Sequence, residues 1–129
     1  MRLPEDDERY LNEKRYAWRL VPDPTTNGAS LVISQYPLHP GKFDRERTDL
    51  MIRIPPSYND AKLDMFYVDP PLVLRRTGGH PGAASVFEDI LGRRWQRFSR
   101  HLPGGNWRAG VDGIASFLKL VNRDLQEPE

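Results

Sequence analysis

The stretch LMIRIPPSYNDAKLDMFYVDPP, residues 50–71, contains the signals that decide the fold class of this chain. In its first part Leu50, Ile52 and Ile54 alternate with Met51 and Arg53, which is the period of a half-buried strand. Prolines 55 and 56 end that strand, because proline cannot donate a hydrogen bond to a neighbouring strand. A second apolar run, residues 65–68, is closed by another pair of prolines. The stretch therefore predicts two strands joined by a short link.

Two further strands are predicted upstream of this stretch. Residues 17–21 place Trp18 and Leu20 on one face, and residues 29–36 place Leu31 and Ile33 on one face. Prolines and an Asn-Gly pair separate the two runs. Four successive strands with short links predict an antiparallel meander.

A helix is expected at each end of the meander. Pro4 is followed by acidic residues, which suit the first turn of a helix, so we expect a helix from about Pro4 to Lys14. After Gly110, apolar residues recur at steps of three and four and predict an amphipathic helix: Val111, Ile114, Ala115, Leu118, Val121 and Leu125. Residues 77–85, rich in glycine and small side chains, predict an irregular loop. The expected fold is a single α+β domain, residues 1–129, with a four-stranded antiparallel meander and two helices.

Composition excludes several classes of function. The chain has 129 residues, of which 38% are hydrophobic, enough for one modest core. Its net charge of +1 argues against a surface that is basic throughout. The absence of cysteine excludes disulfides, thiolate metal sites and a thioester intermediate. No apolar run suits a signal peptide or approaches the roughly 20 residues of a membrane span, so we expect a cytoplasmic protein that does not bind membranes.

Several segments together resemble one protein family. In order they are PPSYND (55–60), DMFYVDPP (64–71), WQRFSRH (95–101) and WRAGVDG (107–113). With the expected strand order, they resemble the ubiquitin-conjugating enzyme superfamily, and most closely its bacterial branch found beside ubiquitin-like proteins and activating enzymes. The resemblance covers nearly the whole chain. Tyr58 matches the family's pattern, whereas Asn59 stands where the family usually has proline.

The resemblance implies that Ser99 occupies the catalytic position. In the family a tryptophan follows the catalytic cysteine at a fixed short interval, Trp107 matches that tryptophan, and the interval leads back to Ser99. A serine can accept an acyl group as an oxygen ester if a base helps it, and His101 stands two residues away. The pair can cooperate only on an extended segment or a loop, because residues two apart face different sides of a helix. The alternative is an inert surface serine flanked by arginines.

His80-Pro81-Gly82 is similar to the His-Pro-Asn triplet that precedes the family's cysteine. Gly82 replaces the asparagine, and the separation from Ser99 is roughly twice the family's interval. An ordinary loop histidine is therefore the alternative for His80.

A basic stretch offers a second class of function. It contains five arginines interleaved with aromatic residues: Arg93, Arg94, Trp95, Arg97, Phe98, Arg100, Trp107 and Arg108. Such a mixture can bind phosphates and stack bases. However, Leu91, Trp95, Phe98 and Leu102 have helical spacing, which predicts that Trp95 and Phe98 are core residues. The arginines are then candidates for binding a partner that carries carboxylates, above all Arg97 and Arg100. Tyr58, which matches the family's pattern, is a further candidate for binding a partner.

Metal and nucleotide sites are not predicted. The three histidines are scattered, and no glycine-rich phosphate loop is present, so we expect no metal and no cofactor. The resemblance implies a component of a bacterial ubiquitin-like pathway, with a ubiquitin-like protein and an activating-enzyme-like protein as partners. Such a component would bind the ubiquitin-like protein and carry it as an oxyester on Ser99. The alternatives are a non-catalytic variant that only binds this partner and a small nucleic-acid-binding module.

Overall fold

Six antiparallel strands form one sheet in a computed structural model that describes residues 1–100 and 107–129. The strand order across the sheet is β1-β2-β3-β4-β6-β5. The strands are β1 (Ala17–Pro22), β2 (Ala29–Pro37), β3 (Arg47–Ile54), β4 (Met65–Asp69), β5 (Val86–Ile90) and β6 (Arg93–Ser99). Two helices, α1 (Glu5–Glu13) and α2 (Ile114–Leu125), complete the α+β fold.

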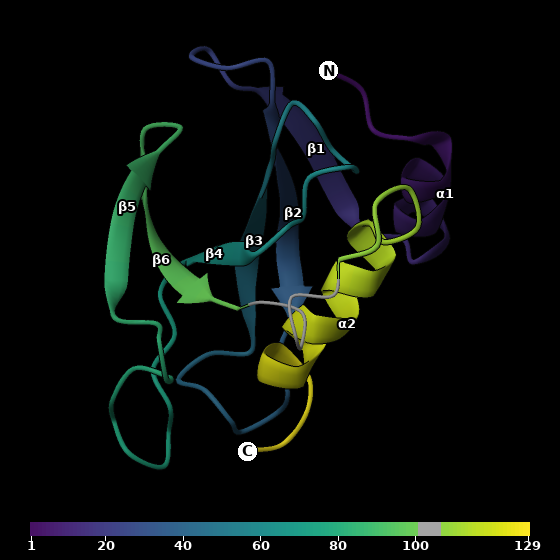
Figure 1. Cartoon of the computed structure of the whole chain (residues 1–129). Coiled ribbons are helices and arrows are strands. Elements are labelled where there is room, and N and C mark those ends of the chain that lie inside the picture. Colours follow the sequence, from purple (N-terminus) through teal and green to yellow (C-terminus); the bar gives the residue numbers. More distant parts are fainter. Residues whose placement is uncertain (101–106) are drawn as a thin grey trace.

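Strands β1 to β4 form the predicted meander. Leu31 lies opposite Ile52, and Ile52 lies opposite Phe66, so apolar side chains form a row across the sheet. Both helices lie on the face that carries this row (Figure 1). The buried face of α2 includes Ile114, Phe117, Leu118, Val121 and Leu125. Val111 lies outside the helix and is 67% exposed, so the helix begins later than its apolar pattern predicts.

The prediction of four strands is wrong, because β5 and β6 extend the sheet beyond β4. Trp95 and Phe98 are both fully buried, as predicted, but on a strand and not on a helix. They lie on opposite faces of β6: Phe98 stacks on Phe66 at 4.6 Å in the core beneath the helices, whereas Trp95 belongs to a cluster on the other face. A strand buried on both faces loses the simple alternation that identifies strands.

The face of the sheet without helices has a small apolar cluster of its own. Val32, Met51, Tyr67 and Trp95 are buried there, with Met65 and Ile90 packed against them. The Arg93 guanidinium lies 4.4 Å from the centroid of the Trp95 ring. We call this side the outer face of the sheet, and the side beneath the helices the inner face.

Candidate functional site

Ser99 lies at the end of β6, where the strand leaves the sheet. It is half-buried and lies opposite Met65 of β4. Its backbone N–H donates to the carbonyl of Ala83 at 3.2 Å. Because Trp95 faces the outer side of the sheet, the alternation of β6 places Ser99 on the outer side too. Strand β6 is extended up to Ser99, whereas His101, its predicted partner, lies outside the described residues.

The segment that contains His80, Pro81 and Gly82 lies beside the end of β6. Besides the bond from Ser99 to Ala83, Arg100 donates to the carbonyl of Gly82 at 2.8 Å. The structure thus brings together two motifs that are far apart in the sequence.

Gln96 fixes this arrangement from inside the protein. Its buried amide nitrogen donates to the carbonyls of Leu72 and Ala84 at 3.1 and 2.9 Å, and its amide oxygen accepts from Leu72 N–H at 2.7 Å. The Nδ1 atom of His80 lies 3.2 Å from the same Gln96 nitrogen. The loop that follows β4 is therefore pinned to β6 at both of its ends.

Arg100 connects the end of β6 to α2. Its guanidinium donates to both carboxylate oxygens of Asp124, at 2.7 and 3.1 Å. A further bond joins it to the carbonyl of Ser99 at 3.0 Å. Arg100 thus holds Ser99, Gly82 and the last turn of α2 in one arrangement.

Three of the other four arginines of the basic stretch also form ion pairs within the chain. Arg93 pairs with Asp49 and Asp69, Arg97 with Glu88, and Arg108 with Asp112. The Nε atom of Arg97 is buried and has no hydrogen-bond partner within the described residues. Partner binding by Arg97 and Arg100 stays a prediction, and it would have to compete with these ion pairs.

Tyr58 belongs to a different part of the molecule. Its hydroxyl donates to Asp7 of α1 at 2.6 Å and accepts from the N–H of Ile114, the first residue of α2, at 2.9 Å. Arg100 binds Asp124, near the opposite end of α2. At a helical rise of about 1.5 Å per residue, Asp124 lies about 15 Å along the helix from Ile114. The structure therefore brings Ser99 and Arg100 together but does not bring Tyr58 to them.

Burial governs the ionisation of the Tyr58 and Asp7 pair. Loss of water, followed by the neighbouring Asp7, raises the pKa of Tyr58 above its ordinary value. Burial also raises the pKa of Asp7, although the hydrogen bonds from Tyr58 and Ile114 oppose that shift. Tyr58 is thus a neutral donor that ties the two helices together, and its role in partner binding stays a prediction.

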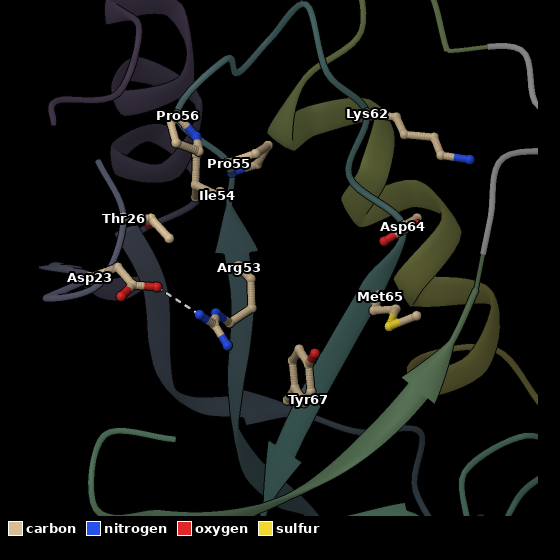
Figure 2. A pocket seen from close by; sticks show the side chains of 10 residues that line it. All are labelled: Asp23, Thr26, Arg53, Ile54, Pro55, Pro56, Lys62, Asp64, Met65 and Tyr67. Carbon is tan, nitrogen blue, oxygen red and sulfur yellow. Dashed lines mark hydrogen bonds and ion pairs between the residues drawn. The ribbon is translucent and has the colours of Figure 1, made fainter. Parts of the chain in front are cut away.

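A hollow of about 370 Å³ opens on the outer face of the sheet. Figure 2 shows its lining side chains, which are Asp23, Thr26, Arg53, Ile54, Pro55, Pro56, Lys62, Asp64, Met65 and Tyr67. Met65, the cross-strand partner of Ser99, joins the hollow to the serine. Arg53 donates to Asp23 at 2.7 Å, whereas Lys62 extends away from that pair (Figure 2). Hydrogen bonds from Thr25 and then from Arg53 lower the pKa of Asp23 to about 2, so its carboxylate is ionised at neutral pH.

The described residues supply no base for Ser99. Within residues 1–100 and 107–129 the Ser99 hydroxyl makes no hydrogen bond. His101, the predicted base, lies outside the described residues. In the same part of the chain no three His, Asp or Glu side chains gather in a way that could hold a metal ion. None of the described helices is long and apolar enough to cross a membrane.

Comparison with protein families decides where the chain belongs. A family model described as prokaryotic E2 family E matches residues 3–128. The chain belongs to this family. The match spans nearly the whole chain and confirms its resemblance to the bacterial branch of the ubiquitin-conjugating superfamily. No curated protein and no solved structure gives a significant match.

Family membership gives the chain an E2-like role in a prokaryotic pathway. In this E2-like chain the sheet has six strands. The chain has no cysteine, and Ser99 lies at the end of β6. Two residues that shape this site, Gln96 and Asp124, were not predicted from the sequence. Strand alternation would have placed Gln96 on the same side as Phe98, but no pattern links Asp124 to Arg100.

Proposed function

We propose that this E2-like protein binds a ubiquitin-like protein and carries it as an oxyester on Ser99, after receiving it from an activating-enzyme-like protein. The observation that supports this proposal is the position of Ser99. It is half-buried, lies on the outer face where a partner can approach, and is held beside the His80-Pro81-Gly82 segment by backbone bonds. Membership of the prokaryotic E2 family supplies the class of reaction.

The transfer step is an acyl transfer and involves no change of oxidation state. The Ser99 oxygen attacks the carbonyl carbon of a thioester between the ubiquitin-like protein and a cysteine of the activating enzyme. A C–O bond forms, the C–S bond breaks, and the sulfur leaves as a thiolate. The hydroxyl proton passes to a base, for which His101 is our candidate.

The chemistry of the adduct tests this proposal. We expect incubation with the activating enzyme, the ubiquitin-like protein and ATP to give an adduct that survives thiols but is cleaved by hydroxylamine or alkali. Ser99→Ala should abolish the adduct and His101→Ala should weaken it, because an unassisted hydroxyl is a poor nucleophile near neutral pH. Ser57→Ala, at an exposed serine between β3 and β4, is the matched control and should leave the adduct unchanged.

A non-catalytic binder is the second candidate function. The observation that favours it is the missing hydrogen bond to the Ser99 hydroxyl among the described residues. If the unmodified proteins bind each other but no adduct forms, this candidate replaces the carrier. An adduct that survives Ser99→Ala would instead show that another residue is the nucleophile.

A further inference from the structure

Within residues 1–100 and 107–129, strand β5 pairs with β6 alone, so its other edge is free. It forms the border of the sheet away from both helices (Figure 1). Leu91 and Gly92, which join β5 to β6, have φ angles of 56° and 72°, as a two-residue type I′ turn requires. In such a hairpin Ile90 and Arg93 form a hydrogen-bonded pair, and bonded and non-bonded pairs alternate from there. Phe87 and Asp89 therefore direct their backbone N–H and C=O groups away from β6.

We propose that this edge binds the C-terminal tail of the ubiquitin-like protein as an added strand, antiparallel to β5. This inference rests on the proposed function, because only a partner joined through its C-terminus must bring a chain end to Ser99. Such an end has to leave the partner's folded body and lie extended. A free strand edge recognises an extended segment through backbone hydrogen bonds whatever its side chains are.

The direction of the strands selects this arrangement. Since β5 and β6 are antiparallel, a strand antiparallel to β5 runs in the same direction as β6. Its C-terminus would emerge at the end of the sheet where β6 finishes with Ser99. A tail added parallel to β5 would deliver its carboxyl group to the Leu91–Gly92 turn, at the wrong end.

The distance from the edge to Ser99 is short enough for a tail to cross. The added strand would lie two strand spacings from β6, about 10 Å, which about three extended residues can span. The crossing passes residues 83–85, whose side chains are small: Ala83, Ala84 and Ser85. The other edge strand, β1, is separated from β6 by three strands and ends in Pro22.

Exposed apolar side chains mark the same edge. The described part of the chain has four large exposed hydrophobic residues. Two of them lie at the ends of β5: Val86, its first residue, is 45% exposed, and Leu91, which follows its last residue, is 38% exposed. Val86 lies at the end of β5 nearest to Ser99, opposite Arg97. A tail that runs along β5 would cover Val86 just before it turns toward the serine.

Amide hydrogen exchange in a tethered complex tests the proposal. Because the chain has no cysteine, Ser99→Cys introduces a single thiol. It can be joined by a disulfide to a ubiquitin-like protein whose last residue is replaced by cysteine. We expect the amides of Phe87 and Asp89 to exchange about tenfold or more slowly in the tethered complex, and that of Glu88, which already faces β6, to be unchanged. Unchanged exchange at Phe87 and Asp89 would overturn the proposal.

A pair of variants isolates the backbone contact. Asp89→Pro removes the outward N–H at an edge position that tolerates proline, whereas Asp89→Ala removes only the side chain. We expect Asp89→Pro to bind the untethered ubiquitin-like protein about tenfold more weakly than Asp89→Ala, with thermal melting as the check that both fold. Equal affinities of the two folded variants would contradict an added strand, and if Asp89→Pro does not fold, the exchange measurement decides. If the unmodified chain forms the adduct but the amides of β5 are not protected, this inference is wrong and the proposed function is unaffected. If there is neither adduct nor binding, the proposed function is wrong.

Discussion

At the scale of single residues, Gly113 marks the closest approach of three segments. A Cβ atom added there would lie 2.7 Å from the Tyr58 hydroxyl and 3.1 Å from Oδ1 of Asp7. The φ of Gly113 is −167°, which any residue can adopt, so the constraint is space and not backbone conformation. We predict that Gly113→Ala lowers the free energy of unfolding by about 1–3 kcal/mol, the usual cost of overpacking.

Urea denaturation followed by fluorescence measures this effect. Gly82→Ala is the control, because a Cβ at Gly82 meets nothing within 4 Å. It should change the free energy of unfolding by less than about 0.5 kcal/mol. Equal stability of the two variants would mean that the contact between Tyr58, Asp7 and Gly113 is looser than the structure has it.

Asp7 makes stability depend on pH. Burial raises its pKa in the folded state above the ordinary value of 3.8, so the folded protein holds this proton more tightly than the unfolded chain does. The resulting stabilisation is fully present below 3.8 and is lost as pH rises through the raised pKa. We predict that Asp7→Asn removes this loss, so its free energy of unfolding relative to the wild type rises between about pH 3.5 and pH 7.

Denaturation at a series of pH values tests this prediction. Asp60→Asn, at an exposed aspartate between β3 and β4, removes the same charge and serves as the control. Its stability relative to the wild type should not show the same rise. Parallel pH profiles for the wild type and Asp7→Asn would refute the assignment.

At the scale of secondary-structure elements, one ion pair joins β6 to α2. Arg100 and Asp124 form a two-pronged contact, and their side chains are only 19% and 26% exposed. Charged hydrogen bonds of this geometry are stronger than most surface ion pairs. We predict a coupling energy of about 1–2 kcal/mol between Arg100→Gln and Asp124→Asn in a double-mutant cycle.

A second pair in the same chain provides the comparison. Arg76 and Glu129 also bond through two nitrogens, but Arg76 is 70% exposed. Solvent screening should limit its coupling energy to less than about 1 kcal/mol. If both cycles give the same small value, Arg100 is not held by α2 and is available to a partner.

At the scale of the whole molecule, the distribution of charge argues against nucleic acid as the partner. The net charge is +1, and Arg93, Arg97 and Arg100 each pair with an acidic side chain. Trp95 and Phe98, which would have to stack on bases, are fully buried. We predict no submicromolar binding of single-stranded oligonucleotides in fluorescence anisotropy at about 0.15 M salt. Tight binding that weakens steeply with salt and disappears in Arg97→Gln/Arg100→Gln would overturn this prediction.

Regular periodicity allowed most elements to be predicted from the sequence alone. The strand patterns at 17–21, 29–36, 50–54 and 65–68 correspond to β1 to β4, because each presents apolar residues to one large core. Acidic residues after Pro4 identified α1, and the spacing of three and four identified α2. These signals are local, so no knowledge of distant contacts was needed.

The features that could not be predicted from the sequence depend on contacts between distant residues. Trp95 and Phe98 have helical spacing, but they lie on a strand because β4 and β5 supply hydrogen-bond partners for β6 on both sides. In the sequence, His80 lies far from Ser99, the predicted site. In the structure, hydrogen bonds from Gln96 and Arg100 hold the loop so that Gly82 and Ala83 lie beside Ser99. Arg93, Arg97 and Arg100 belong to a basic run in the sequence, yet their acidic partners come from other strands and from α2. Folding alone brings such pairs together, because charge in a sequence is local and ion pairing is a property of three-dimensional contact.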